Sequence, residues 1–217
     1  HMLGLAKRVK ARILQASTSE VYGTAIYAPI DEQHPLQGQS PYSATKIGAD
    51  QIALSYYRAF GLPVTVVRPF NTYGPRQSTR AIIPTIITQA LHRDVIEVGS
   101  RDPVRDMVFV KDTAQGFIQI ADSEQCIGEV TNLATQVGVT VGELIDQIQD
   151  IVGRRLPVIE KDERKRPEKS EVFKLLGSAQ AAADRAGWKA QVSLADGLRQ
   201  SIEWFRRQRV TDDVGVY

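Results

Sequence analysis

A tyrosine and a lysine stand four residues apart in the stretch SPYSATK, which runs from Ser40 to Lys46. Ser40 suits the N-cap of a helix, and Pro41 suits its first turn, where no backbone N–H is needed. The spacing then places Tyr42 and Lys46 on one helix face, one turn apart. An ammonium group beside a phenol favours the phenolate, so such a tyrosine can shuttle protons near neutral pH. A solvated helix face is the competing interpretation.

A second group of polar residues lies upstream, in the stretch ILQASTSEVYG from Ile13 to Gly23. Its apolar start predicts a buried strand, and the strand ends in a small polar turn that holds Thr18, Ser19 and Glu20. A turn residue that bonds its own backbone is the competing interpretation of Thr18. The pattern therefore predicts a hydroxyl-bearing loop at residues 17–20, the hydroxyl loop, at the end of a strand that precedes the helix of Tyr42 in the chain.

Two later segments complete a pattern: RPFNTYGPR, from Arg68 to Arg76, and RDMVFVKD, from Arg105 to Asp112. In this order the four segments resemble the extended short-chain dehydrogenase/reductase family. Within it they are similar to nucleotide-sugar 4,6-dehydratases, decarboxylases and epimerases, over nearly the whole chain. The segment 23–50 looks closest to hexosamine 4,6-dehydratases of legionaminic-acid-type pathways.

The resemblance implies catalytic roles for the hydroxyl loop and the helix. Thr18 would hydrogen-bond the C4 oxygen of a sugar, and Tyr42 would accept the proton of the C4 hydroxyl as hydride passes to NAD. Lys46 would also bind the nicotinamide ribose, and the resemblance places Tyr42, Lys46 and Phe70 among the cofactor contacts.

Ser19 and Glu20 distinguish subfamilies in the same resemblance. Glu20 would remove the C5 proton once C4 is a ketone, because the ketone acidifies that C–H bond. Dehydratases of dTDP-glucose commonly have Asp-Glu at this pair. Ser19 takes the Asp position here, as in GDP-mannose-type dehydratases and UDP-glucuronate decarboxylases. The proton donor for water loss is therefore open, and Glu20 is able to do both jobs.

Three polar residues resemble the contacts to the diphosphate of a nucleotide sugar: Asn71, Arg76 and Arg105. An arginine fork matches phosphate oxygens in a bidentate way. A surface ion pair is the competing interpretation of Arg76.

Four further residues complete the expected substrate site. Arg166 and Glu168, in KRPEKSEV, resemble a loop that closes on the nucleotide, with a solvated charged loop as the alternative. Ile83 and Pro84 resemble the segment near the nucleobase, with core packing as the alternative. The implied ligand is a UDP- or GDP-linked hexosamine or hexuronate.

The elements that must position these groups alternate between strand and helix. Ile13–Ala16, predicted to be buried on both faces, and Val64–Val67, also buried, are expected to be neighbouring parallel strands. Residues 41–60 are predicted to form a helix that ends at Gly61. Ser17 to Gln39 is predicted to be irregular. Further helices are expected at residues 3–8 and 80–91 and from Lys111 onward. Two more are expected after the capping boxes Thr140/Glu143 and Ser193/Asp196. Further strands are expected at residues 95–98, 104–110 and 130–133.

The predicted fold class is α/β: a partial Rossmann-like, doubly wound parallel sheet with a small C-terminal α/β substrate-binding part. Residues 1–80 would belong to the dinucleotide-binding domain and 81–217 mostly to the nucleotide-sugar part, with the chain crossing between them. Family members begin with a glycine-rich turn that holds the pyrophosphate of NAD at a helix N-terminus. No GxxGxxG or GxGxxG motif lies near the N-terminus here.

We therefore expect a truncated member whose glycine-rich cofactor half is missing, and whose own binding of NAD is in question. This supports two hypotheses. The chain comes from a hexosamine-type 4,6-dehydratase lineage, with a UDP-glucuronate decarboxylase or an epimerase as alternatives. Alternatively, it is a non-catalytic remnant that binds nucleotide sugar or assembles as a dimer.

The composition of the chain limits the kinds of partner and ligand that we expect. The net charge of +2 at pH 7 makes no demand for nucleic acid or an anionic membrane, and no apolar run is long enough to span a bilayer. The single Cys126 and three histidines without ligand spacing predict neither a disulfide nor a metal site, which fits the cytoplasm. The helix of Tyr42 has a second apolar face that includes Ile52, Tyr56 and Tyr57. The resemblance implies that this face forms a homodimer contact, with core packing as the alternative.

Overall fold

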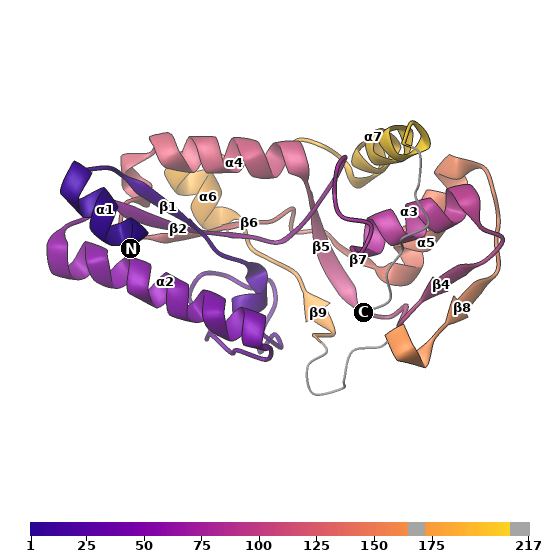
Figure 1. The fold of residues 1–217 in the computed structure, drawn as a ribbon, viewed down its shortest axis with the longest axis horizontal. Helices are drawn as coiled ribbons and strands as arrows, with labels where there is room; N and C mark the ends of the chain where they lie inside the picture. Colours follow the sequence, from indigo (N-terminus) through magenta and orange to yellow (C-terminus); the bar gives the residue numbers. More distant parts are fainter. Residues whose placement is uncertain (165–171, 209–217) are drawn as a thin grey trace.

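The computed structural model describes residues 1–164 and 172–208 and shows two lobes side by side (Figure 1). The lobe at the left of the view contains the predicted catalytic segment, residues 13–46. The lobe at the right contains a second group of helices. The long strand β5 (Val104–Phe109) runs between them.

The first lobe is built on a three-stranded parallel sheet in the order β1 (Ile13–Ala16), β2 (Val64–Pro69), β6 (Val130–Leu133). Ile13 pairs with Val64, and Ala16 with Val67. The prediction that these two segments are parallel neighbours is confirmed. The prediction that β1 is buried on both faces is wrong: its residues are half-buried or exposed, because β1 is an edge strand whose outer side has no neighbour in the described residues.

Helices cover both faces of this sheet. The helices α1 (Met2–Val9) and α2 (Pro41–Phe60) lie on one face, and α4 (Val110–Asp122) and α6 (Gln180–Ala186) on the other (Figure 1). Ala6, Ala53 and Val64 share the core on the α1–α2 side, and Ile120, Leu133 and Trp188 the core on the other side. Short 3-10 helices lie at η1 (Ser19–Tyr22) and η2 (Glu124–Cys126).

The second lobe surrounds a mixed sheet. Strand β5 pairs in parallel with β3 (Asn71–Tyr73) and β9 (Lys174–Leu175), and antiparallel with β7 (Gly138–Thr140). A separate parallel pair joins β4 (Ile96–Val98) to β8 (Val158–Glu160), before η3 (Asp162–Arg164). The apolar core lies among α3 (Ile82–His92), α5 (Val141–Val152) and α7 (Leu194–Arg206).

The chain crosses between the lobes more than once. Strand β6 and helices α4 and α6 come from beyond residue 80, yet they pack in the first lobe. The buried carboxylate of Asp106, in β5, connects this strand to the segment between β6 and β7. It accepts hydrogen bonds from the backbone N–H of Thr135 at 2.7 Å and of Gln136 at 2.9 Å. The division at residue 80 stays a prediction.

Local signals set most helix boundaries. The Thr140–Glu143 capping box is present with both of its bonds, and Ser193 caps α7 through the N–H of Asp196. The segment 17–39 is irregular as predicted, except for η1, and the helix expected at 80–91 begins at Ile82 instead. Among the described residues, no helix combines the length and the apolar character that a membrane crossing requires.

Candidate active site

The N-terminus of α2 forms as its sequence predicts. Ser40 Oγ accepts from the N–H of Ser43 at 3.1 Å, and Ser43 Oγ accepts from the N–H of Ser40 at 3.0 Å. Pro41 occupies the first turn. The ammonium of Lys46 lies over the ring of Tyr42, 5.9 Å from its centroid, which confirms the shared helix face. The Tyr42 side chain is 51% exposed, so a ligand can reach its hydroxyl.

Lys46 also connects α2 to the sheet. Its Nζ donates to the carbonyl oxygen of Ala16, the last residue of β1, at 3.1 Å. Because Ser17 and Thr18 follow Ala16 directly, this bond brings the hydroxyl loop to the base of the Tyr42 turn. The structure therefore brings together two of the predicted segments that lie apart in the sequence.

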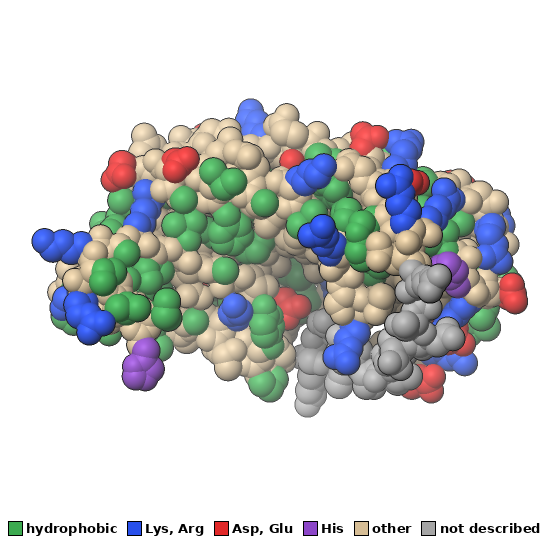
Figure 2. Space-filling model, turned by 45° about the horizontal axis from the view of Figure 1, so that its top comes forward, with side chains coloured by type: hydrophobic (Ala, Val, Ile, Leu, Met, Phe, Trp, Pro, Cys, Tyr) green, Lys and Arg blue, Asp and Glu red, His purple; other side chains and the backbone are tan. Residues whose placement is uncertain are grey.

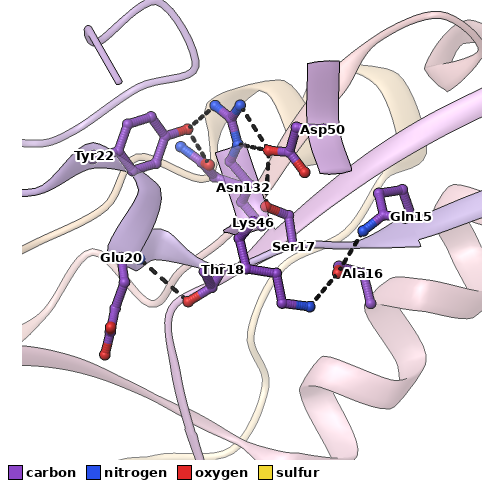
Figure 3. A network of polar contacts seen from close by, with 10 residues as sticks. Gln15, Ala16, Ser17, Thr18, Glu20, Tyr22, Lys46, Asp50 and Asn132 are labelled. Atoms are coloured by element: carbon purple, nitrogen blue, oxygen red, sulfur yellow. Dashed lines mark hydrogen bonds and ion pairs between the residues drawn. The ribbon is translucent and has the colours of Figure 1, made fainter. Parts of the chain in front are cut away.

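Thr18 is the N-cap of η1. Its Oγ1 accepts from the N–H of Glu20 at 3.2 Å, the local bond that the competing interpretation expects. A hydroxyl that accepts one bond keeps its own proton for donation, so this bond is compatible with donation to a sugar oxygen. Ser19 is only 2% exposed, whereas Glu20 is half-buried. Figure 3 shows Thr18, Glu20 and Lys46 pointing away from the buried network behind them.

That buried network contains residues to which sequence analysis assigned no role. The hydroxyl of Tyr22 donates to Asn132 Oδ1 at 2.7 Å and accepts from Arg68 Nη1 at 3.0 Å. Arg68 Nη2 in turn lies 3.0 Å from Asp50 Oδ2 (Figure 3). Asp50 continues the four-residue spacing of Tyr42 and Lys46, which is the sequence signal that could have found it.

The electrostatics of this network distinguish it from the exposed site. Burial raises the pKa of Tyr22 to about 12, although the guanidinium of Arg68 opposes the rise. Tyr22 is therefore a neutral phenol that holds structure, and Tyr42 is the accessible one. Burial also raises the pKa of Asp50, against the opposing effects of Arg68 and the Ser17 hydroxyl.

Two of the predicted diphosphate residues lie on adjacent strands. Asn71 in β3 pairs with Met107 in β5, and Arg105 lies two residues before Met107. Because side chains alternate along a strand, Asn71 and Arg105 belong to the same face of this sheet. Asn71 Oδ1 is buried and has no hydrogen-bond partner within the described chain. Arg105 Nη1 donates to the carbonyl oxygen of Val104 at 3.0 Å.

The remaining predicted residues lie in different environments. Arg76 is exposed, in the turn after β3, with a left-handed backbone (φ 69°) that is costly for a residue with a side chain. Ile83 and Pro84 are buried in α3, where Ile83 belongs to the apolar core. Phe70 is 2% exposed and stacks near Tyr22, with 6.5 Å between ring centroids. Any contact of Phe70 with a cofactor would involve its backbone. Arg166 and Glu168 lie outside the described residues.

The described residues fit one end of NAD better than the other. Tyr42 and Lys46 present a phenol and an ammonium on an accessible helix face, which suits a ribose. Strand β1 leads into η1, and β2 leads into Phe70, so neither enters a glycine-rich turn that opens a helix. Residues 1–164 and 172–208 also contain no group of three or more His, Cys, Asp or Glu side chains placed to hold a metal ion.

Comparison with known proteins gives a consistent set of similarities. The family model described as GDP-mannose 4,6 dehydratase matches residues 1–201. UDP-glucuronic acid decarboxylase 2 of Arabidopsis thaliana is 34% identical over 228 residues, which cover 98% of this chain and 48% of that protein. The chain thus spans about half the length of the curated relatives it matches.

Solved structures extend the similarity to the fold. The dTDP-glucose 4,6-dehydratase of Bacillus anthracis, in complex with NAD, matches with a TM-score of 0.85 and 28% identity, over 95% of this chain and 65% of that one. TunA, described as an NAD-dependent NDP-hexosamine 5,6-dehydratase of tunicamycin biosynthesis, matches with a TM-score of 0.88 and 26% identity, over 96% and 68%.

Proposed function

Because this chain belongs to the family of NAD-dependent nucleotide-sugar epimerases and dehydratases, we propose that it carries the substrate site and the acid–base residues of a hexosamine-type nucleotide-sugar 4,6-dehydratase. The observation that carries the proposal is the face of α2: Tyr42 and Lys46 lie together, and Lys46 is bonded to the strand end that leads into Thr18 and Glu20.

The first step is oxidation at C4. Thr18 donates a hydrogen bond to the C4 oxygen, and Tyr42, as phenolate, accepts the proton of the C4 hydroxyl. The Lys46 ammonium stabilises the phenolate across one helical turn. NAD, when bound, supplies the acceptor for the C4 hydride and later returns that hydride. Tyr42 and Lys46 are the described residues that would hold its ribose.

The second step is loss of water across C5 and C6. The C4 ketone acidifies the C5–H bond, so the carboxylate of Glu20 can remove that proton. The electron pair left at C5 forms the double bond to C6 as the C6 hydroxyl leaves. Ser19 is too buried to meet a ligand, so Glu20, now protonated, returns its proton to the departing hydroxyl and water is released. C6 would then receive the hydride back from bound NAD, and C5 would regain a proton, which completes the 4-keto-6-deoxy sugar. The proton that Tyr42 took from the C4 hydroxyl balances the one that C5 gains.

Substrate binding is assigned to the second lobe. The guanidinium groups of Arg105 and Arg76 can pair with diphosphate oxygens. The side-chain N–H2 of Asn71 can donate to such oxygens as well, whereas its buried and unsatisfied Oδ1 accepts and would need a donor group of the ligand. Arg166 and Glu168 would close on the nucleotide, and Ile83 and Pro84 would act by packing behind the nucleobase rather than by direct contact, since both are buried.

A UDP-glucuronate decarboxylase is the second candidate. The specific support is the 34% identity to the Arabidopsis thaliana decarboxylase over 98% of this chain. The Thr18-Ser19-Glu20 sequence is compatible with it, as the resemblance implies. In that reaction the C4 ketone would accept the electron pair released when CO2 leaves C5, so Tyr42 would keep its role and Glu20 would not remove a C5 proton.

A candidate of another class is a non-catalytic module that binds nucleotide sugar or assembles as a dimer. Its support is the lack of a glycine-rich helix-opening turn after β1 and β2. Without such a turn the described residues offer no cradle for the pyrophosphate of NAD.

One experiment separates these three candidates. The protein is incubated with NAD and with either UDP-N-acetylglucosamine or UDP-glucuronate, and products are analysed by mass spectrometry. A product lighter than UDP-N-acetylglucosamine by one water supports the dehydratase, and a pentose with release of CO2 supports the decarboxylase. Saturable sugar binding without product supports the non-catalytic module, and a lack of binding to either sugar contradicts the assigned substrate site.

A further inference from the structure

Three elements of the first lobe meet at the carboxylate of Asp50. Its Oδ2 accepts from Ser17 Oγ at 2.8 Å, at the end of β1. The same oxygen accepts from Arg68 Nε at 3.1 Å and Nη2 at 3.0 Å, in β2. Asp50 itself lies in α2, so one oxygen joins the helix to two neighbouring strands (Figure 3).

This junction is almost fully buried. The exposed fraction is 0% for Asp50, 2% for Arg68 and 7% for Ser17. A buried ion pair adds little net stability, because the cost of removing both charges from water offsets their attraction. Such a pair does restrict geometry, since breaking it would leave an uncompensated charge in the core. The effect of Asp50 is therefore expected in the relative placement of the elements that it joins.

The joined elements are those that carry the proposed acid–base residues. Asp50 lies one helical turn beyond Lys46 and two beyond Tyr42, on the same face of α2. Ser17 directly precedes Thr18, and its backbone N–H donates to the carbonyl oxygen of Val67 at 2.8 Å, beside Arg68. Together with the bond from Lys46 to Ala16, these contacts fix two successive residues to α2, the last residue of β1 and the first residue of the hydroxyl loop.

We propose that Asp50 is a positioning residue: through Ser17 and Arg68 it sets the hydroxyl of Thr18 against Tyr42 and Lys46 before any ligand binds. This inference rests on the proposed function, because the relative placement of these groups matters only where they act on one substrate. Asp50 itself reaches no ligand, since it is buried beneath the accessible face.

The matched control for Asp50 is Asp106. It is also fully buried and also accepts several hydrogen bonds, but from other donors: the backbone N–H groups of residues 135, 136 and 177 and the hydroxyl of Thr135. Asp50→Asn and Asp106→Asn each remove one buried negative charge without changing side-chain size. If Asp50 only stabilised the fold, both variants would speed amide exchange to a similar extent throughout the protein.

The test is amide hydrogen exchange of the ligand-free protein, read by mass spectrometry. We expect exchange about ten-fold faster in the segment 17–22 and in the first turns of α2 for Asp50→Asn, and unchanged there for Asp106→Asn. A second readout is the ¹³C-methyl signal of reductively methylated Lys46, assigned with Lys46→Arg. It should shift in Asp50→Asn and stay in place in Asp106→Asn.

A milder variant keeps the proposal testable if Asp50→Asn fails to fold. Ser17→Ala removes one bond and leaves the Asp50–Arg68 pair in place, so it should speed exchange in 17–22 and leave the first turns of α2 unchanged. Exchange in 17–22 that stays at the wild-type rate in Ser17→Ala, or that rises equally in Asp106→Asn, would overturn the inference.

These outcomes are independent of the proposed function. The exchange and methyl measurements need neither NAD nor sugar, so a failure to bind nucleotide sugar would refute the function alone. Uniform loosening in both aspartate variants would refute the positioning role alone.

Discussion

The ammonium group of Lys46 donates a hydrogen bond to the carbonyl oxygen of Ala16, 3.1 Å away, and so joins the helix of Tyr42 to the end of β1. The two residues are thirty positions apart in the sequence. Their contact brings a motif that is common on solvated helix faces next to a loop with a hydroxyl and a carboxylate. The proposed chemistry depends on that proximity more than on the four-residue spacing alone.

The close approach of α7 to Tyr73 gives a first prediction. A Cβ added at Gly197 would lie 2.1 Å from the Tyr73 hydroxyl oxygen, which is far inside contact distance. Gly197→Ala should therefore destabilise the protein, because an overpacking cost of about 1–3 kcal/mol exceeds the gain in helix propensity, about 1 kcal/mol. The measurement is the melting temperature, which should fall by a few degrees.

Gly142 in α5 is the matched control for this substitution. A Cβ there would meet only Arg101, with its nearest atoms at 3.6 Å, an ordinary contact. Gly142→Ala should leave the melting temperature unchanged or raise it, by about 0.5–1 kcal/mol of added stability. Equal behaviour of the two alanine variants would contradict the packing seen at Tyr73.

Local sequence signals predicted α2 in full. Ser40, Pro41 and Gly61 act on their own neighbourhood, and the helix runs between them as expected. The pairing of β1 with β2 was also predictable, because alternating strands and helices favour parallel neighbours. These features depend on residues close in sequence or on a general rule of topology.

Tertiary contacts explain what the sequence did not reveal. Asp50 and Arg68 are eighteen residues apart, and only the packing of α2 on β2 brings them into one ion pair. The exposure of β1 depends on its place at the sheet edge, which composition does not show. The resemblance alone assigned Phe70 to the cofactor, and the sequence did not show that its ring lies in the core beside Tyr22.

The capping box of α5 predicts a pH dependence of stability. The hydrogen bonds from the backbone N–H and hydroxyl of Thr140 hold the pKa of Glu143 below its usual range. A carboxyl with a lowered folded-state pKa contributes stability that is present above the unfolded pKa and is lost as pH falls through the folded one. The advantage of wild type over Glu143→Gln should therefore be present at pH 7 and shrink below about pH 4.

Thermal unfolding of both proteins across this pH range is the measurement. The two curves should converge on the acid side, because a protonated Glu143 and a glutamine differ little in charge. A gap in melting temperature that stays constant from neutral to acid pH would contradict a charge-dependent cap.

The apolar surface of α1 and α2 predicts self-association. Met2, Leu5 and Val9 on α1 and Ile52 and Phe60 on α2 are large hydrophobic side chains with at least 42% exposure. Figure 2 shows hydrophobic side chains gathered on the half of the molecule that carries these helices. Exposed apolar patches of this kind mark protein contacts, so we predict a homodimer at tens of micromolar.

Sedimentation of charge variants tests the dimer. Ile52→Glu should shift the protein to monomer, because a carboxylate in an apolar contact is not compensated. Ile118→Glu is the control, since Ile118 is similarly exposed, at 55%, but lies on α4 across the sheet. A monomeric wild-type protein would refute the prediction, and a dimer that survives Ile52→Glu would exclude this helix face.

The non-catalytic candidate makes its own prediction: residues 1–217 bind nucleotide sugar and do not turn it over when NAD is added. The diphosphate contacts lie within the chain, whereas the described residues offer no cradle for the pyrophosphate of NAD. Mass spectrometry of UDP-N-acetylglucosamine after incubation should show no 4-keto product. Formation of that product would show that NAD is held without a glycine-rich turn, and would overturn the non-catalytic candidate.

The most direct test of the substrate site is calorimetric titration of the protein with UDP-N-acetylglucosamine, with Arg105→Ala and Tyr42→Phe as variants. Charge-assisted hydrogen bonds are worth about 1.5–3 kcal/mol each, and the ordering of loops on binding opposes them. We therefore predict weak binding by wild type, at the millimolar end, that Arg105→Ala abolishes and Tyr42→Phe hardly changes. Tight binding that is insensitive to Arg105→Ala would contradict the assigned site.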